Sequence, residues 1–169
     1  MSEHQIVYAA RIEAPVARAW EVISDFESIA NVAPQVSASR LTSEQSTGIG
    51  ATRHCDLTLF GSTVEERIVE WDEGRSLKID IYESKRIPLV GRQQGTFVVE
   101  EDGNGSRVIA SLDYEIKYGP LGGLMHEAML RRKLDGSWLA FVAGIKQFAE
   151  TGEPVESSTT LPLAQVSAA

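Results

Sequence analysis

The chain has 169 residues, enough for one domain with a sizeable hydrophobic core. Hydrophobic residues make up 43 % and charged residues 24 %, values that are ordinary for a folded globular protein. The formal charge of −8 argues against nucleic acid and anionic membrane surfaces as partners, because both carry dense negative charge.

Cys55 is the only cysteine, so the chain can form no internal disulfide and suits a reducing compartment. The sequence contains no secretory leader and no apolar run near the roughly 20 residues of a membrane span. We therefore expect a cytoplasmic protein without an integral membrane segment. Its oligomeric state stays open between monomer and dimer.

The N-terminal residues predict a strand followed by two short helices. Ile6–Ile12 alternates between two sets of side chains, as a strand does. Pro15 suits the first turn of a helix, and the next residues carry apolar side chains at helical spacing: Val16, Trp20 and Ile23. Ser24 and Glu27 have the spacing of a capping box, which predicts a second helix of about two turns before Pro34.

From residue 35 to 118 the apolar residues mostly recur at every second position, which predicts strands separated by glycine-containing turns. The longest break in this pattern is residues 82–95, YESKRIPLVGRQQG. We expect six further strands, at Val36–Leu41, Thr52–Leu59, Thr63–Trp71, Leu77–Tyr82, Thr96–Glu100 and Val108–Tyr118.

Strand parity predicts which side chains face inward, provided that the turns at Glu73-Gly74 and near Gly61 each contain two residues. One inward face then comprises Leu77, Ile79, Ile81, Glu70, Ile68, Glu66, Val64, Leu59, Leu57, Cys55 and Arg53. The last predicted strand gives a second inward row, Val108, Ala110, Leu112, Tyr114, Ile116 and Tyr118. An odd-length loop at either turn would reverse the adjoining assignment.

A segment rich in glycine and proline leads from these strands to a long amphipathic helix. The apolar stripe of this helix comprises Leu124, Ala128, Leu134, Trp138, Phe141, Val142, Ile145 and Phe148. Residues 152–169 are rich in serine, threonine and alanine and show no periodicity. We therefore expect a single domain at 1–151 and a disordered C-terminal tail at 152–169.

These elements predict an α+β fold with a cavity. Seven strands at about 4.8 Å spacing make a sheet roughly 30 Å wide, whereas one helix is only about 10–12 Å across. The sheet must therefore curl round the long helix, with the two short helices closing one side. Small inward residues such as Ala110, Gly91 and Gly95 make the interior hard to fill. Because interiors are normally close-packed, a hollow favours a bound ligand.

Three stretches carry a resemblance to a known superfamily: IEAPVARAWEVISDFESIANVAPQV, VEERIVEWDEGRSLKIDI and the C-terminal YGPLGGLMHEAML…LAFVAGIKQFAE. They resemble the START-like or SRPBCC proteins, and most closely the polyketide cyclase/dehydrase and lipid-transport family. The resemblance spans about residues 5 to 150. It implies a helix-grip fold, a seven-stranded curved antiparallel sheet around a long C-terminal helix, with an apolar cavity between them. It brings no shared catalytic motif.

Glu66 is the most specific candidate for a ligand-orienting or catalytic residue. Parity places it among apolar residues, and a carboxylate there must be paired, hydrated or protonated. Arg53 lies on the same face and is its candidate partner. Glu66 could orient a ligand or act as a catalytic residue; a structural ion pair is the alternative interpretation.

The predicted cavity wall draws on the inward strand faces, the gate described next and the helix stripe. The expected ligand-binding residues are Arg53, Leu57, Glu66, Ile68, Ile79, Ile81, Leu89, Phe97, Ala110, Leu112, Tyr114, Tyr118, Leu124, Ala128, Leu134 and Trp138. Plain core packing is the competing interpretation for the aromatic members. Two segments, 82–95 and 118–125, are expected at one end of the cavity. Ile87, Pro88, Leu89 and Val90 would form an apolar gate there or pack on the helix as core.

The remaining reactive side chains do not indicate a catalytic or metal site. His126 is expected in solvent on the long helix, and His54 and Asp56 share the outer face of a strand without a third metal ligand at useful spacing. Cys55 has no evident base and is expected to be a small buried apolar residue. No glycine-rich phosphate loop is present. We therefore expect no metal and no other cofactor.

The sequence is compatible with two main functions and with a third, less favoured one. The first is the binding, transport or sequestration of a small hydrophobic ligand such as a lipid, isoprenoid, quinone or aromatic polyketide. The second is an aromatase/cyclase or dehydratase that uses the same cavity without a metal or nucleotide cofactor. An interaction module with an acidic surface and a filled interior is the third. The residues favour the first, because no nucleophile–base pair can be located.

Overall fold

The computed structural model describes residues 2–169 except 88–89, 118, 120–123, 125–128 and 157. Within this part of the chain, one antiparallel sheet has the strand order β2-β3-β4-β5-β6-β7-β1-β8. The strands are β1 Ser2–Ile12, β2 Val36–Leu41, β3 Thr52–Leu57, β4 Thr63–Asp72, β5 Ser76–Lys85, β6 Val90–Asp102, β7 Gly105–Ile116 and β8 Val166–Ala168. The helices are α1 Val16–Ser24 and α3 Arg131–Thr151, with 3-10 turns η1 Ile29–Asn31 and η3 Leu163–Gln165.

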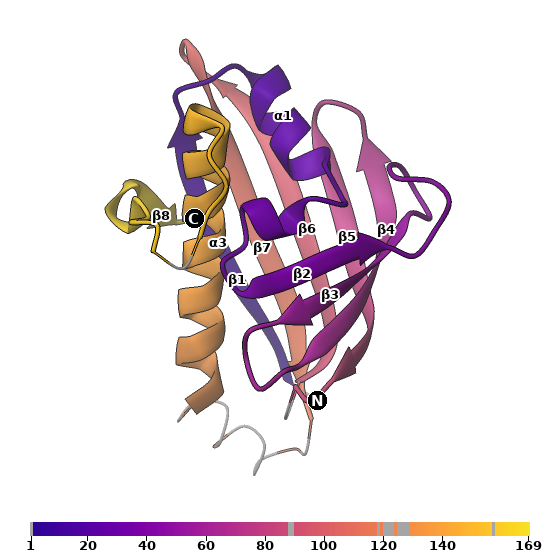
Figure 1. Ribbon diagram of the computed structural model, residues 1–169. Helices are drawn as coiled ribbons and strands as arrows, with labels where there is room; N and C mark the ends of the chain where they lie inside the picture. Colours follow the sequence, from indigo (N-terminus) through magenta and orange to yellow (C-terminus); the bar gives the residue numbers. More distant parts are fainter. Residues whose placement is uncertain (1, 88–89, 118, 120–123, 125–128, 157) are drawn as a thin grey trace.

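The sheet is strongly curved and wraps around α3 (Figure 1). The helix α3 runs along β1, α1 lies across one end of the concave face, and β2 and β3 curl over the other side. Buried side chains of the sheet, α1 and α3 form a continuous hydrophobic core. The predicted α+β helix-grip architecture is confirmed. None of the helices described is both long and apolar enough to cross a membrane.

Two details of the predicted architecture were wrong. The described sheet has eight strands rather than seven, because Val166–Ala168 pairs with Tyr8–Ala10 of β1. The expected second helix is only the single turn η1. Its predicted cap fails because Asp25 ends α1 and its Oδ1 accepts a hydrogen bond from the Ser28 backbone N–H at 3.2 Å. Such a local side-chain bond offers the backbone an alternative to a helix.

A β-bulge keeps the predicted inward face of β4 despite a longer turn. Asp72 pairs with Ser76, so the β4–β5 turn has three residues rather than two. The register shifts between Ile68 and Glu70, which restores the pairing of Glu66 with Ile81. Glu66 therefore faces inward as predicted. Glu70, predicted inward, instead lies before the shift with its side chain 65 % exposed.

The expected long break at 82–95 is mostly strand. β5 continues to Lys85 and β6 begins at Val90, so the described residues leave only a short connection. The pattern failed because this part of β6 carries Gly91, Arg92, Gln93 and Gln94 instead of alternating apolar residues. Pairing with β5 and β7, through contacts such as Gln93 with Ile81 and Tyr114, outweighs the weak local preference.

Polar side chains hold the C-terminal end of α3 in place. Arg18 of α1 donates to the carbonyl oxygens of Phe148 and Ala149 at 3.3 Å each, at the negative end of the α3 dipole. The buried Nζ of Lys146 donates to the Arg11 carbonyl at 2.8 Å and pairs with Glu150 at 2.5 Å. These contacts hold the C-terminal half of α3 against β1 and α1.

Gly144 allows α3 to approach the segment after η1 without a side chain between them. A Cβ at this position would lie 1.9 Å from the carbonyl oxygen of Val32, which is far inside van der Waals contact. The glycine inside the predicted helix therefore has a packing role, and its cost to helix stability is offset by this contact.

The residues expected to form a tail contact the domain at several points. Val155 is buried, and its backbone N–H donates to the Asn31 carbonyl at 2.8 Å. Beyond it, β8 pairs with the outer edge of β1. The division into a domain at 1–151 and a disordered tail at 152–169 stays a prediction, which limited proteolysis can test.

Candidate ligand cavity

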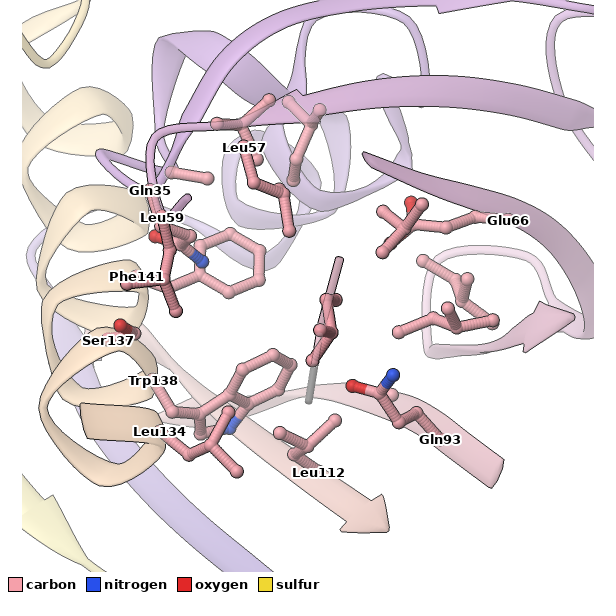
Figure 2. A pocket seen from close by; sticks show the side chains of 18 of the residues that line it. Gln35, Leu57, Leu59, Glu66, Gln93, Leu112, Leu134, Ser137, Trp138 and Phe141 are labelled. Atoms are coloured by element: carbon pink, nitrogen blue, oxygen red, sulfur yellow. The ribbon is translucent and has the colours of Figure 1, made fainter. Parts of the chain in front are cut away.

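A cavity of about 140 Å³ lies between α3, the η1–β2 segment and the concave face of the sheet. Figure 2 shows side chains from the helix and from opposite sides of the curved sheet converging on it. Apart from Gly95, most of the lining is aliphatic or aromatic: Ile29, Ala33, Val36, Leu57, Leu59, Val64, Ile79, Ile81, Ile87, Phe97, Leu112, Leu130, Leu134, Trp138 and Phe141. The polar lining residues are Gln35, Arg53, Ser62, Glu66, Gln93 and Ser137.

Three aromatic side chains of the cavity lining pack against one another. Trp138 and Phe141 of α3 pack edge-on with ring centroids 5.2 Å apart, and Phe97 of β6 completes the group at 5.5 Å from Phe141. The Trp138 indole N–H donates to the Ala110 carbonyl at 3.0 Å, so this ring has a fixed orientation. Gly95, one strand from Ala110, lies beneath the Trp138 and Phe97 rings on the sheet.

The polar lining residues of the sheet fall in one cross-strand row. Arg53 pairs with Glu66, Glu66 with Ile81, and Ile81 with Gln93. The row continues from Gln93 to Tyr114 and from Tyr114 to His4. Its neighbour toward α1, by contrast, is apolar: Ile68, Ile79, Gly95, Leu112 and Ile6. The register therefore sets a polar row into an otherwise apolar concave face.

Arg53 and Glu66 form a buried ion pair within this row. The Arg53 Nε donates to Glu66 Oε2 at 2.5 Å, and the side chains are only 4 % and 12 % exposed. Arg53 also donates through Nη1 to the Phe26 carbonyl at 2.7 Å, and its guanidinium lies 4.0 Å from the centre of the Phe26 ring. Its charge is therefore engaged on several sides.

Cys55 lies beside this pair, with its Sγ 3.8 Å from Glu66 Oε2. Burial, reinforced by the Glu66 charge, raises the pKa of the Cys55 thiol to about 12. The thiol is therefore protonated at neutral pH and is a poor nucleophile. Its place on the buried face agrees with the prediction of a small apolar residue.

Two glutamines of the lining have unsatisfied polar atoms. Gln93 is only 5 % exposed, and within the described structure its Nε2 has no hydrogen-bond partner. The same holds for Oε1 of Gln35. Buried polar groups normally have partners, so an unpaired amide in a cavity wall calls for an explanation such as a ligand or water.

Nine of the sixteen predicted wall residues line this cavity: Arg53, Leu57, Glu66, Ile79, Ile81, Phe97, Leu112, Leu134 and Trp138. Four lie elsewhere. Ile68 and Ala110 are closed off in the core, Tyr114 stacks on His4 at 5.4 Å, and Leu124 is 70 % exposed. Leu89, Tyr118 and Ala128 lie outside the described residues.

The expected gate is divided between core and cavity wall. Val90 is 1 % exposed and pairs with Ile116, so it belongs to the core rather than to an exposed loop. Ile87 is half-buried and lines the cavity. Pro88 and Leu89 lie outside the described residues.

Sequence reasoning missed four polar lining residues, Gln35, Ser62, Gln93 and Ser137. Gln93 was hidden because its segment was interpreted as a loop. Ser137 precedes Trp138 on α3, and its inward position follows from helical spacing to Leu134 and Phe141, which were on the predicted stripe. No local signal marks Gln35 or Ser62, which lie in turns at the ends of strands.

The outer face of β3 and β4 carries a separate polar cluster. The ring nitrogens of His54 contact Glu65 Oε1 and, at 3.2 Å, Asp56 Oδ1. The hydrogen bond to Glu65 is the main cause of a raised His54 pKa. Among the described residues no group of three His, Cys, Asp or Glu side chains could hold a metal ion. His126 lies outside those residues.

The sequence profile of the polyketide cyclase/dehydrase and lipid transport family matches residues 3–151. The chain belongs to this family. No curated protein matches the sequence significantly. This family member is similar in fold to the Zhui aromatase/cyclase from a Streptomyces species, with a TM-score of 0.74 and 16 % identity over 91 % of this chain and 100 % of that one. It also resembles a protein from Thermus thermophilus, with a TM-score of 0.70 and 20 % identity over 86 % of this chain and 97 % of that chain.

Proposed function

We propose that this protein binds a small, mainly apolar molecule in the cavity between α3 and the concave sheet, as a carrier or sequestering protein. The observation that carries the proposal is the lining: among the described residues, fifteen aliphatic or aromatic ones, one glycine and six polar ones surround a hollow of about 140 Å³. Close packing is the rule in protein interiors, so a hollow of this kind favours a bound ligand. Burial of apolar ligand surface, at about 25 cal/mol per Å², would drive binding.

The size of the cavity limits the ligand. An apolar cavity of roughly 150 Å³ holds one benzene molecule, and this cavity has about 140 Å³. A ligand of one ring therefore fits without movement of the lining. A fused polycyclic molecule or a long acyl chain requires the wall to move or the ligand to extend beyond it.

Native mass spectrometry of freshly purified protein tests the proposal directly. We expect a co-purifying apolar molecule, or, after extraction, a rise in Tm when toluene is added, because a ligand of the folded state stabilises it. Ser137→Phe places a ring in the cavity and should abolish the toluene shift. Arg132→Phe on the exposed face of the same helix should keep it. An unliganded spectrum together with equal, negligible shifts in all three proteins would reject the proposal.

A cyclase or dehydratase is the second candidate. It is favoured by the geometry of Glu66. Its Oε2 accepts hydrogen bonds from both Arg53 and Cys55, while its Oε1 has no partner among the described residues. A carboxylate oxygen open to a cavity can act as a general base on a bound ketone. The Zhui protein is an aromatase/cyclase, which makes this chemistry worth testing here.

Glu66→Gln distinguishes the two candidates. In a carrier it changes affinity or ligand orientation only, whereas in a cyclase it abolishes turnover of a poly-β-ketone substrate. We favour the carrier because the polar lining that the structure describes contains no nucleophile–base pair and the neighbouring thiol is protonated.

A further inference from the structure

We propose that the polar row selects a neutral ligand that donates a hydroxyl hydrogen bond to Glu66 and accepts one from Gln93, and that it rejects anionic ligands. This inference rests on the proposed function and names the chemical class that the cavity would take. It is carried by three observations on the same row: an open carboxylate oxygen, an unpaired amide and an arginine whose charge is already paired with Glu66.

The first observation is the one-sided engagement of Glu66. Arg53 and Cys55 both approach Oε2, at 2.5 and 3.8 Å, and within the described part of the chain no group donates to Oε1. In Figure 2 the Glu66 side chain reaches into the cavity from the wall opposite Trp138 and Leu134. A carboxylate oxygen only accepts hydrogen bonds. The matching ligand group is therefore a donor, such as a phenol, an alcohol or an enol.

The second observation is the unpaired amide of Gln93. It lies two strands from Glu66 in the same row, a backbone separation of about 10 Å at the usual strand spacing. Its side chain is 5 % exposed and points into the cavity (Figure 2). Because the last torsion of a glutamine is soft, its amide NH₂ can turn toward a ligand. An acceptor there, such as a ketone oxygen, would satisfy a donor that is otherwise buried without a partner.

The third observation is the engagement of Arg53. It is the one cation of the described lining, and its guanidinium already contacts Glu66, the Phe26 carbonyl and the Phe26 ring. A carboxylate or phosphate ligand would meet the negative charge of Glu66, and the charge of Arg53 is already balanced by that carboxylate. Burying such an unpaired charge is strongly unfavourable. Fatty acids and other anions are therefore poor ligands for this cavity.

Isothermal titration calorimetry with four one-ring compounds tests the inference on the full chain at pH 7. 4-Hydroxyacetophenone carries both groups, 4-methoxyacetophenone lacks the donor, 4-ethylphenol lacks the acceptor, and 4-hydroxybenzoate replaces the ketone by a carboxylate. We expect 4-hydroxyacetophenone to bind at least about tenfold more tightly than the methoxy compound and the benzoate, because hydrogen bonds to charged groups are the stronger ones. A smaller preference, of a few fold, is expected over 4-ethylphenol.

Two variants assign these preferences to residues. Gln93→Met keeps the volume and removes the amide, so the preference for 4-hydroxyacetophenone over 4-ethylphenol should disappear while the preference over the methoxy compound stays. Glu66→Gln removes the negative charge and frees Arg53, so 4-hydroxybenzoate should gain affinity and overtake 4-methoxyacetophenone. The folded state of each variant is checked by its near-UV circular dichroism.

The outcomes separate the inference from the function on which it rests. Equal affinity for the hydroxy and methoxy compounds, or tight binding of the benzoate to the unaltered protein, overturns the inference and leaves a nonselective apolar cavity. A Gln93→Met variant that keeps all preferences overturns the role of Gln93. Absence of binding by all four compounds and by toluene overturns the proposed function itself.

Discussion

Side chains alternate in the same way at both ends of the concave face, but one end is closely packed and the other encloses a cavity. Under α1 the interior is filled: Ile12, Ile68, Leu77, Val108 and Ile145 are at most 1 % exposed, and the hollow beside Val22 and Ile145 measures about 10 Å³. Under the N-terminal half of α3 the hollow measures about 140 Å³. A space of about 10 Å³ is at the limit for a single water, whereas the larger one can hold a ring.

The filled end owes its packing to the helices that cover it. Trp20 of α1 packs edge-on against Trp71 at 5.0 Å, and both indole N–H groups donate to the carboxylate of Glu73, at 3.0 and 2.8 Å. At the other end the large rings of Phe97, Trp138 and Phe141 pack against one another in the cavity wall, and the polar row interrupts the apolar face. Close packing and the cavity therefore lie at different ends of one concave face.

Breaking the ion pair of the polar row should have the largest effect on stability. Arg53→Met leaves Glu66 as an unpaired charge that is 12 % exposed, and we expect a loss of about 3–5 kcal/mol in the free energy of unfolding. The double variant Arg53→Met/Glu66→Leu removes both charges and should recover most of that loss. Urea unfolding of the three proteins measures this. A double variant no more stable than Arg53→Met would mean that the arginine contributes mainly through Phe26.

The two ends can be compared through one kind of substitution. Leu77→Ala at the filled end removes a side chain that is 1 % exposed, and should cost about 2–5 kcal/mol in the free energy of unfolding. Leu134→Ala enlarges a cavity that already exists and should cost about 1 kcal/mol, because the half-buried leucine lacks contacts on one side. Urea unfolding with m-values checks both. Equal costs would mean that the cavity wall is as well packed as the core.

The sequence predicted strands and inward side chains correctly where apolar residues alternate regularly. It failed where the position of a segment is determined by pairing with neighbouring strands. Regular strands gave the inward row of β7 and the pairing of Arg53 with Glu66, and the shortage of helix gave the hollow. The inward position of Glu66 was predicted from a two-residue turn that does not exist; the bulge beside Val69 cancelled the error. A bulge is set by the pairing of two strands, so no local pattern announces it.

The segment around Gln93 was wrongly predicted to be a break between strands. This segment has a weak strand preference, and only its neighbours β5 and β7 hold it in the sheet. The same polar composition that hid the strand provides the polar row of the cavity. Sequence rules that expect apolar residues at inward positions fail at this polar row for the same reason.

The smallest expected effect lies on the outer face, where His54 reports on a polar cluster remote from the cavity. The hydrogen bond to Glu65 raises the His54 pKa first, with further support from Asp56, against the opposing effects of burial and Arg40. Because the pKa is higher in the folded than in the unfolded chain, the stabilisation is complete below about pH 6.5 and is lost as the pH rises through the folded value. His54→Gln should therefore lower the free energy of unfolding by about 1 kcal/mol or less at pH 5.5, and by a smaller amount at pH 8.5. Urea unfolding at the two pH values measures the difference, and toluene binding at pH 7 should be unchanged, since His54 faces away from the cavity. A loss that grows toward high pH would show that the neutral imidazole, rather than the imidazolium, is the form that the folded protein prefers.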